Sequence, residues 1–261
     1  MTDRPADPGS PGTVEGLTGT TALVTGASRG FGRAIATALS GVGAHVVGVA
    51  RDQTRLDDLR DELGDTLTPV VAEVTDPDVA ARLIDEHRPR TLVLNAGATP
   101  LLRPLHHQTW ETFSRNWEVD VQQVFHWVRE AMLHPLLPGS TVIAVSSGAA
   151  INGSPLSGGY AGAKATITFM TSYAAAESKR EGLGITFASV LPQLTPATQL
   201  GASGVAAYAE HQGVDLDSFL QGFGPTLTRE HVGTAIVDPA AGRHLHRDSY
   251  LLTPTGLAPL S

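Results

Sequence analysis

Short apolar runs alternate along the chain with longer segments that carry apolar residues every three or four positions. Runs that are apolar at nearly every position and are bounded by turn residues are typical of strands buried on both faces. They predict six strands, at residues 21–24, 45–49, 68–74, 91–94, 141–145 and 185–191, and a final edge strand at 250–252. The helical spacing predicts helices at residues 32–42, 56–63, 78–86, 110–133, 160–179 and 229–237.

The alternation of strands and helices indicates an α/β fold. Strands separated by helical segments at this spacing form a parallel sheet with right-handed crossovers and helices on both faces. No repeat or linker divides the pattern, so residues 17–261 are predicted to form a single domain. Residues 1–16 are rich in Pro and Gly and lack periodicity, which predicts a flexible N-terminal tail.

Composition narrows the class of protein. In 261 residues, 41% are hydrophobic and 17% are charged, which is typical of a soluble globular protein with a substantial core. The net charge of -8 argues against a nucleic-acid partner, because phosphates favour a basic surface. The chain has no cysteine, which excludes disulfides, thiolate catalysis and cysteine-bound metals. With no apolar leader or spanning stretch, we expect a cytoplasmic protein without a membrane partner.

The turn between the first predicted strand and helix is rich in glycine. Glycine allows the backbone to approach a pyrophosphate closely, and the amides at the start of the following helix attract the anion. At the first strand–helix crossover this pattern favours dinucleotide binding on a Rossmann-type, doubly wound sheet. The predicted phosphate-binding residues are Gly26, Ser28, Arg29, Gly30, Phe31 and Gly32.

The end of the second strand discriminates between the two nicotinamide cofactors. An NAD site carries an acid there for the ribose 2′-hydroxyl, whereas an NADP site carries a cation for the 2′-phosphate. Here Ala50 fills the acid position and Arg51 follows it. Arg29 could reach the same phosphate, so NADP(H) is the predicted cofactor. Two alternatives stay open: both arginines are simply solvated, or Asp52 contacts the ribose and NAD(H) binds.

A tyrosine and a lysine four residues apart provide candidate proton-transfer chemistry. Tyr160 and Lys164 share one face of a predicted helix, and a nearby cation favours the ionised form of a phenol. Tyr160 could therefore act as a general acid or base near neutral pH. An isolated Tyr/Lys pair is usually structural, but this one follows a buried strand that ends in Ser146 and Ser147.

Together these motifs resemble the short-chain dehydrogenase/reductase (SDR) family. The resemblance runs from about Leu17 to the C-terminus and is carried by Thr25-Gly-x-x-x-Gly-x-Gly32, Asn95-Ala96-Gly97, Ser147 and Tyr160-x-x-x-Lys164. It implies that Tyr160 donates a proton to a carbonyl or removes one from an alcohol. It also implies that Ser147 hydrogen-bonds the reacting oxygen, and that Lys164 binds the nicotinamide ribose and promotes ionisation of the tyrosine.

The resemblance implies further roles around the cofactor. Asn95, Ala96 and Gly97 would border it, and Glu73 and Val74 would lie against the adenine. Ser146 should point away from the nicotinamide, because side chains alternate along a strand. Members of this family usually pair through two long helices, so a homodimer or homotetramer is also implied.

The chain departs from the family pattern within the long helix. Asp120 stands where the family usually has an asparagine that holds a water of the proton relay. An ionised Asp120 near Lys164 would offset part of the effect of the lysine on Tyr160, whereas a protonated one could still donate a hydrogen bond. Asn116, one turn earlier, is a possible substitute. Alternatively, the register is shifted by one residue and Asp120 points elsewhere.

A second departure follows the sixth strand, where the family commonly has Pro-Gly and this chain has Pro192-Gln193. The Gln193 side chain would enter the space beside the nicotinamide. Thr195 or Thr198 could bond the carboxamide, although hydrogen bonds within the loop are equally compatible with the sequence.

The segment near residues 194–224 is predicted to be a substrate lid. It is rich in Gly and Ala, which suits motion. Its aromatic and imidazole side chains either set specificity or belong to ordinary packing; they are Tyr208, His211 and Phe219.

The predicted activity is an NADP(H)-dependent oxidoreductase that interconverts a ketone and a secondary alcohol. The chain shows no arginine clamp in the lid, which favours an uncharged or weakly polar substrate. No metal is expected, since His106 and His107 lack a neighbouring carboxylate cluster, and no G-x-S-x-G turn supports a hydrolase. The alternatives are a redox-neutral epimerase, isomerase or dehydratase on the same scaffold, and a non-catalytic NADP(H) sensor.

Overall fold

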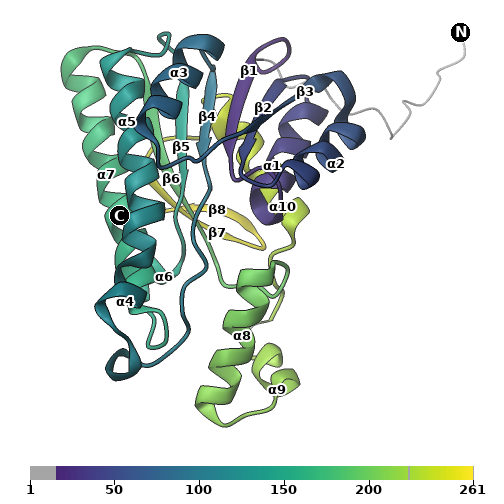
Figure 1. The fold of residues 1–261 in the computed structure, drawn as a ribbon, viewed down its shortest axis with the longest axis vertical. Helices are drawn as coiled ribbons and strands as arrows, with labels where there is room; N and C mark the ends of the chain where they lie inside the picture. Colours follow the sequence, from purple (N-terminus) through teal and green to yellow (C-terminus); the bar gives the residue numbers. More distant parts are fainter. Residues whose placement is uncertain (1–15, 223, 261) are drawn as a thin grey trace, which may run out of the picture.

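The computed structural model describes residues 16–222 and 224–260, so the predicted tail lies almost wholly outside the described residues. Within these ranges, eight strands form one sheet in the order β3-β2-β1-β4-β5-β6-β7-β8 (Figure 1). The strands are β1 Thr21–Thr25, β2 His45–Ala50, β3 Leu67–Val71, β4 Thr91–Leu94, β5 Thr141–Val145, β6 Thr186–Pro192, β7 Ser249–Thr253 and β8 Gly256–Pro259. The six predicted strands are confirmed to within three residues at each end.

The sheet is parallel from β3 to β7, and only β8 runs antiparallel. The strand predicted at residues 250–252 is confirmed as β7, but its predicted place at the edge of the sheet is wrong. β7 pairs with β6 on one side and with β8 on the other, so β8 occupies the edge. The four residues of β8 include Gly256 and Pro259, and so short a run gives little strand signal.

Helices cover both faces of the sheet (Figure 1). They are α1 Gly30–Gly41, α2 Gln53–Leu63, α3 Pro77–His87, α4 Trp110–Asn116, α5 Gln122–Leu133, α6 Ala149–Asn152, α7 Gly158–Glu181, α8 Gln199–Gln212, α9 Leu216–Gln221 and α10 Arg229–Ala240. α1, α2 and α10 pack on one face of the sheet, and α3, α5 and α7 pack on the other. This arrangement confirms the predicted doubly wound α/β fold.

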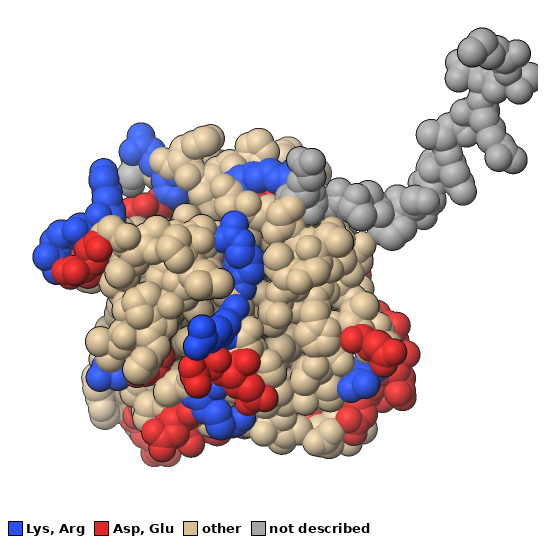
Figure 2. All heavy atoms as spheres, turned by 90° about the horizontal axis from the view of Figure 1, so that it is seen from above, with Lys and Arg blue, Asp and Glu red and all other residues tan. Residues whose placement is uncertain are grey.

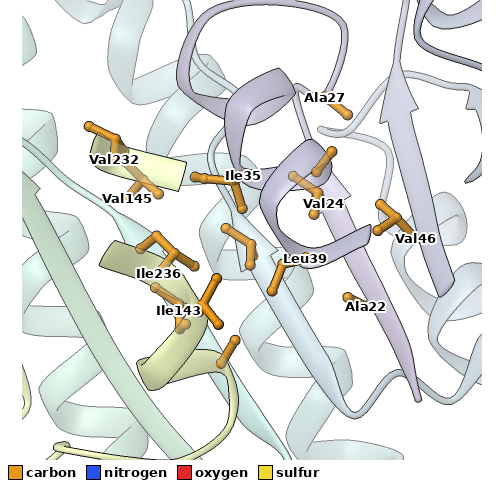
Figure 3. Close-up of a cluster of buried hydrophobic side chains, with 14 of the residues drawn as sticks. Ala22, Val24, Ala27, Ile35, Leu39, Val46, Ile143, Val145, Val232 and Ile236 are labelled. Atoms are coloured by element: carbon orange, nitrogen blue, oxygen red, sulfur yellow. The ribbon is translucent and has the colours of Figure 1, made fainter. Parts of the chain in front are cut away.

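Two apolar layers form the core, one on each side of the sheet. Along β1, Ala22 and Val24 belong to the layer under α1 and α10, whereas Leu23 belongs to the opposite layer. Figure 3 shows the first layer, in which Ile35 of α1 and Ile236 of α10 point toward the strands. All of these side chains are fully buried, which explains why the strands are apolar at successive positions.

The long helix predicted at residues 110–133 is formed in three parts. α4 and α5 flank a π-helical turn at Trp117–Val121. Such turns hold an extra residue within an α-helix and occur often at functional sites. Asp120 lies within this turn, and its carboxylate is 1% exposed.

The predicted lid contains two helices, α8 and α9, that the sequence analysis did not identify. Their Gly- and Ala-rich sequence gives little apolar periodicity. Figure 1 shows α8 and α9 extending below the sheet, in the same direction as α6. α6 and α8 follow the carboxyl ends of β5 and β6, where ligands bind in open α/β sheets.

The opposite end of the molecule carries mixed charge. Figure 2 shows Lys and Arg side chains next to Asp and Glu side chains on this face, rather than one continuous basic area. Exposed ion pairs of this kind include Arg88–Asp85 and Arg180–Glu177. Within the described ranges, no helix is both long enough and apolar enough to cross a lipid bilayer.

Candidate active site

The glycine-rich turn, residues 25–32, joins β1 to α1. Gly26 and Gly30 have φ values of +69° and +58°, a conformation that favours glycine. A Cβ on Gly26 would lie 2.8 Å from Ala96 Cα, and one on Gly32 would lie 2.2 Å from Gly26 O. These two glycines are therefore required by packing within the protein, in addition to any requirement from a ligand.

The first turn of α1 suits an anion. Arg29 occupies the N-cap position, no described side chain caps this end, and the first turn contains no acid. By contrast, side chains of Asp52, Asp76 and Thr228 cap α2, α3 and α10. Helix amides without a side-chain cap are donors for a phosphate, so the turn fits the pyrophosphate of a dinucleotide.

The Asn95-Ala96-Gly97 segment follows β4 and lies against the glycine-rich turn. The Asn95 side-chain amide donates to Thr25 O at 3.2 Å and to Gly26 O at 3.4 Å. The backbone amides of Asn95 and Ala96 donate to the Thr25 hydroxyl at 2.9 and 3.2 Å. The structure thus joins the ends of β1 and β4, at the place where the sequence resemblance puts the cofactor.

The residues predicted to choose the cofactor lie on the surface. The Arg51 side chain is 75% exposed, and its guanidinium pairs with Glu73 at 3.3 Å. Arg29 donates to the Gln199 side chain at the start of α8, at 3.2 Å. Asp52 accepts from the Arg55 amide at 3.1 Å as the N-cap of α2. Both arginines are solvent-accessible, and Asp52 has a structural role that the sequence analysis did not assign.

Val74 and Glu73 lie in different environments. Val74 is buried, and its carbonyl accepts a hydrogen bond of 2.9 Å from the indole N–H of Trp127. Glu73 is exposed beside Arg51. Only Glu73 can therefore interact through its side chain with a ligand at the surface without a rearrangement.

Lys164 lies in a buried polar cluster at the end of β5. Its Nζ is 3.3 Å from Asp120 Oδ2, donates to Val145 O at 3.1 Å, and lies 5.6 Å from the centroid of the Tyr160 ring. Burial acts to lower the pKa of Lys164, but the Asp120 carboxylate and Tyr160 together outweigh burial and raise the pKa above its ordinary 10.5. The ammonium is thus held in its charged form beside the tyrosine.

Asp120 is fixed by two hydrogen bonds and by the close approach of the backbone at Gly97. Its Oδ1 accepts from the Ala98 amide at 2.7 Å and from the Asn116 side chain at 3.4 Å. A Cβ on Gly97 would lie 2.8 Å from Oδ2, so the backbone passes directly over the carboxylate. The alternative that Asp120 points away from the site is wrong. The Asn116 amide bonds Asp120 and Ala98 O, and a role for Asn116 as a substitute for the family's asparagine stays a prediction.

The two serines after β5 face different ways. Ser146 is buried, donates to Lys164 O at 2.8 Å and accepts from Thr168 at 3.1 Å. Ser147 is partly exposed, and its hydroxyl accepts only the local Ala149 amide, at 3.2 Å, among the hydrogen bonds of the described residues. Ser146 thus supports the helix that carries Lys164, and Ser147 is the serine accessible to a substrate.

The segment after β6 lies next to Gly148. The Gly148 amide donates to Pro192 O at 2.9 Å, and the Gln193 amide donates to Leu252 O at 3.0 Å. The Gln193 side chain is exposed. Thr195 is buried, with its hydroxyl bonded to Leu227 O and to the Ala197 amide. In this structure Thr195 therefore makes the loop hydrogen bonds that the sequence left open, and a contact with the carboxamide stays a prediction.

The lid contacts the rest of the site on two sides. At one end of α8, Gln199 meets Arg29 of the glycine-rich turn. Farther along, the Tyr208 hydroxyl bonds Ser154, which bonds Ser157 at 2.7 Å just before α7. Thr198 caps α8 through the Gly201 amide. These contacts attach the predicted lid to the glycine-rich turn at one end and to the segment before α7 at the other.

Other sequence candidates lie outside this site. His106 and His107 are exposed, with ring centroids 4.1 Å apart. In the part of the chain that the structure describes, no group of three or more His, Cys, Asp or Glu side chains could hold a metal. His211 of the lid is also exposed.

Gln123, a buried polar residue of this site, was not predicted from the sequence. Its side-chain amide bonds the Thr25 hydroxyl and Ala96 O. The available signal was a polar residue three positions after Asp120, on a helix face otherwise occupied by Val124 and Trp127.

Comparison with known proteins identifies the family. The family model for short chain dehydrogenases matches residues 20–208. The chain belongs to the short-chain dehydrogenase family. The resemblance inferred from the sequence motifs is thereby confirmed.

Relatives with described activities are similar over part of their length. L-xylulose reductase of Homo sapiens is 36% identical over 134 residues, covering 50% of this chain and 54% of the relative. Carbonyl reductase [NADPH] 2 of Sus scrofa is 32% identical over 164 residues, covering 62% and 66%. The match thus spans little more than half the length of the L-xylulose reductases, so it does not assign their substrates to this chain.

Solved structures support the fold. The 3-ketoacyl-(acyl-carrier-protein) reductase of Brucella melitensis, complexed with NADH, has a TM-score of 0.73 at 22% identity and covers 86% of this chain and 91% of its own. A protein of Burkholderia xenovorans described as a short-chain dehydrogenase/reductase also has a TM-score of 0.73, at 26% identity, with 86% and 90% coverage. At these identities the likeness concerns the arrangement of strands and helices.

Proposed function

We propose that this protein is an NADP(H)-dependent oxidoreductase that transfers hydride between the nicotinamide and a ketone or secondary alcohol. The observation that carries the proposal is the buried Lys164 ammonium, held 5.6 Å from the Tyr160 ring centroid at the carboxyl end of β5. Membership of the short-chain dehydrogenase family and the accessible Ser147 support the same activity.

Each residue has a distinct task in the proposed reaction. In the reductive direction, the Tyr160 hydroxyl gives its proton to the carbonyl oxygen of the substrate, while the Ser147 hydroxyl donates a hydrogen bond to that oxygen. Lys164 supplies positive charge beside the phenol, and Asp120 keeps that ammonium in place. The bound cofactor supplies or accepts the hydride.

The cofactor preference rests on charge at the end of β2. Arg51 is exposed there, and Ala50 occupies the position at which an NAD site carries an acid. Asp52 caps α2, which favours a structural role over a ribose contact. Carbonyl reductase of Sus scrofa carries NADPH in its name, whereas the Brucella structure contains NADH. The preference for NADP(H) therefore depends on these residues of the chain itself.

The proposed substrate is an uncharged or weakly polar carbonyl compound. The lid side chains that bond residues around the site are Tyr208, which bonds Ser154, and Gln199, which bonds Arg29. None of these carries a charge that would hold an anionic substrate.

The proposal is tested by following NADPH absorbance with a panel of neutral ketones. Tyr160→Phe should lower kcat/KM by about 10²–10⁴-fold, the range for loss of a general acid, while NADPH still binds. Tyr173→Phe is the matched control, because Tyr173 lies on the same helix and is 68% exposed. Full activity of the Tyr160 variant would contradict the assigned role.

Two further outcomes separate the alternative functions. Substrate turnover at constant NADPH absorbance would indicate a redox-neutral epimerase, isomerase or dehydratase. NADPH binding without turnover across the panel would indicate a sensor, and failure to bind any nicotinamide nucleotide would exclude all three functions.

We also propose a cytoplasmic homodimer or homotetramer, by resemblance to the family. Exposed apolar side chains on the two long helices support association: Phe125 and Leu133 on α5, and Phe169 on α7. Sedimentation of the purified protein tests the oligomeric state directly.

A further inference from the structure

Gln123 is a buried polar residue that the proposed proton transfer does not use. It lies on α5 and is 1% exposed. Its side-chain Oε1 accepts from the Thr25 hydroxyl at 2.9 Å, and its Nε2 donates to Ala96 O. One amide therefore connects a helix to the last residue of β1 and to the segment after β4.

The Thr25 hydroxyl is the centre of this connection. It donates to Gln123 and accepts the backbone amides of Asn95 and Ala96, at 2.9 and 3.2 Å. A hydroxyl has one proton and two lone pairs. By taking the proton, Gln123 leaves both lone pairs directed at the two amides. The other acceptor near this hydroxyl is Val93 O, at the longer distance of 3.5 Å.

Gln123 also completes a series of contacts along one helix face. Asn116, Asp120 and Gln123 are spaced by four and three residues across the π-helical turn. Asn116 donates to Ala98 O at 2.8 Å, Asp120 accepts from the Ala98 amide at 2.7 Å, and Gln123 donates to Ala96 O. All three side chains are 1% exposed. The backbone of residues 96–98 is thus attached to the helix at three points.

There is little free space between this segment and the glycine-rich turn. A Cβ on Gly26 would lie 2.8 Å from Ala96 Cα, so Ala96 packs directly against the turn. We propose that Gln123 is a positioning residue that holds residues 95–98 against the glycine-rich turn in the geometry that binds the cofactor. This inference rests on the proposed cofactor site.

The test compares two neighbouring glutamines on one helix. Gln123→Met removes both hydrogen bonds at similar volume, and Gln122→Met is the matched control because Gln122 is exposed. NADPH dissociation constants are measured by fluorescence titration, and thermal unfolding is measured without nucleotide. Gln123→Met should raise the Kd for NADPH by about tenfold, equivalent to about 1.4 kcal/mol, and Gln122→Met by less than about twofold, within about 0.4 kcal/mol.

A structural role alone would give a different result. If Gln123→Met lowers the melting temperature but binds NADPH with an unchanged Kd, the proposal is overturned. Amide exchange of Ala96 and Ala98 in the folded protein provides a second measure, and it should become faster in Gln123→Met only. Unchanged exchange at both amides would also count against the proposal.

A second variant covers the case in which Gln123→Met does not fold. Gln123→Asn keeps a polar side chain but is too short to reach Thr25 and Ala96 together, so it should also weaken NADPH binding. Wild-type affinity in this variant would overturn the proposal. If the wild-type chain binds no nicotinamide nucleotide, the proposed function fails and the inference fails with it. If the wild-type chain binds NADPH and Gln123→Asn binds it equally well, only the inference fails.

Discussion

The two halves of the candidate site differ in how their charged groups are held. On the catalytic side, Lys164 and Asp120 are buried and bonded to the backbone of β5 and of the segment after β4. On the side predicted to bind the 2′-phosphate, Arg51 pairs with Glu73 in open solvent. A buried pair is costly to disrupt, whereas an exposed pair contributes little to stability. The charges that we propose to be catalytic are therefore fixed before a ligand arrives, and those that we propose to select the cofactor are free to exchange partners.

The largest expected effect is on stability at the buried side. Lys164→Met leaves Asp120 charged and without its ammonium partner, so we expect the free energy of unfolding to fall by about 3–5 kcal/mol. Arg51→Met, the exposed counterpart, should change it by less than about 0.5 kcal/mol. Urea denaturation of both variants at pH 7 measures their free energies of unfolding. Equal losses of stability in the two variants would contradict the contrast between the buried and the exposed pair.

The same variant has a defined pH dependence. The pKa of Lys164 is raised above 10.5, so the contribution of its charge is complete below the unfolded value and is lost as pH rises through the folded value. The stability gap between wild type and Lys164→Met should therefore narrow above pH 10.5. A gap that is constant with pH would show that the charge of Lys164 is not the cause.

The next effect concerns cofactor choice at the exposed side. Arg51→Ala would remove the proposed charge-assisted contact with the 2′-phosphate, and a contact of that kind contributes about 1.5–3 kcal/mol. NADPH binding should weaken by about tenfold or more, and NADH binding should barely change. Titration of the wild type and the variant with each nucleotide measures the two losses of affinity. Equal losses for both would refute the assignment of NADP(H).

A smaller effect is expected from neutralising Asp120. The carboxylate helps to raise the pKa of Lys164, so Asp120→Asn should let the ammonium lose its proton at lower pH. The alkaline limb of the pH–rate profile, where that charge is lost, should move to lower pH. A limb that does not move would mean that the carboxylate does not hold the charge of Lys164.

The smallest effect should come from the exposed acid. Glu73→Gln breaks the pair with Arg51 and should change the free energy of unfolding by less than about 0.5 kcal/mol. Chemical denaturation measures it. A loss of unfolding free energy as large as that of Lys164→Met would contradict the contrast between the buried and the exposed pair.

The sequence predicted most of the sheet because buried parallel strands are apolar at successive positions, as along Ala22, Leu23 and Val24. It did not predict α8, whose glycines and alanines give little apolar periodicity, or β8, which is only four residues long.

Within the site, motif spacing led to Asp120 and Lys164. Two contacts were not predictable from local sequence. Arg51 meets Glu73 through long side chains on different segments, and Gln123 meets Thr25 across 98 positions. A glutamine in an amphipathic helix is compatible with either a solvated or a buried face, and only the tertiary packing decides between them.

The π-helical turn at Trp117–Val121 also fixes the rotational phase of everything after it. One residue of an α-helix corresponds to about 100° of rotation. If the turn lost its extra residue and became regular α-helix, α5 would rotate by about that angle relative to α4. Gln123 would then leave Thr25, and Trp127 would leave the carbonyl of Val74. The single additional residue therefore sets which side of α5 faces the sheet. A deletion there would change the contacts of the whole helix with the sheet.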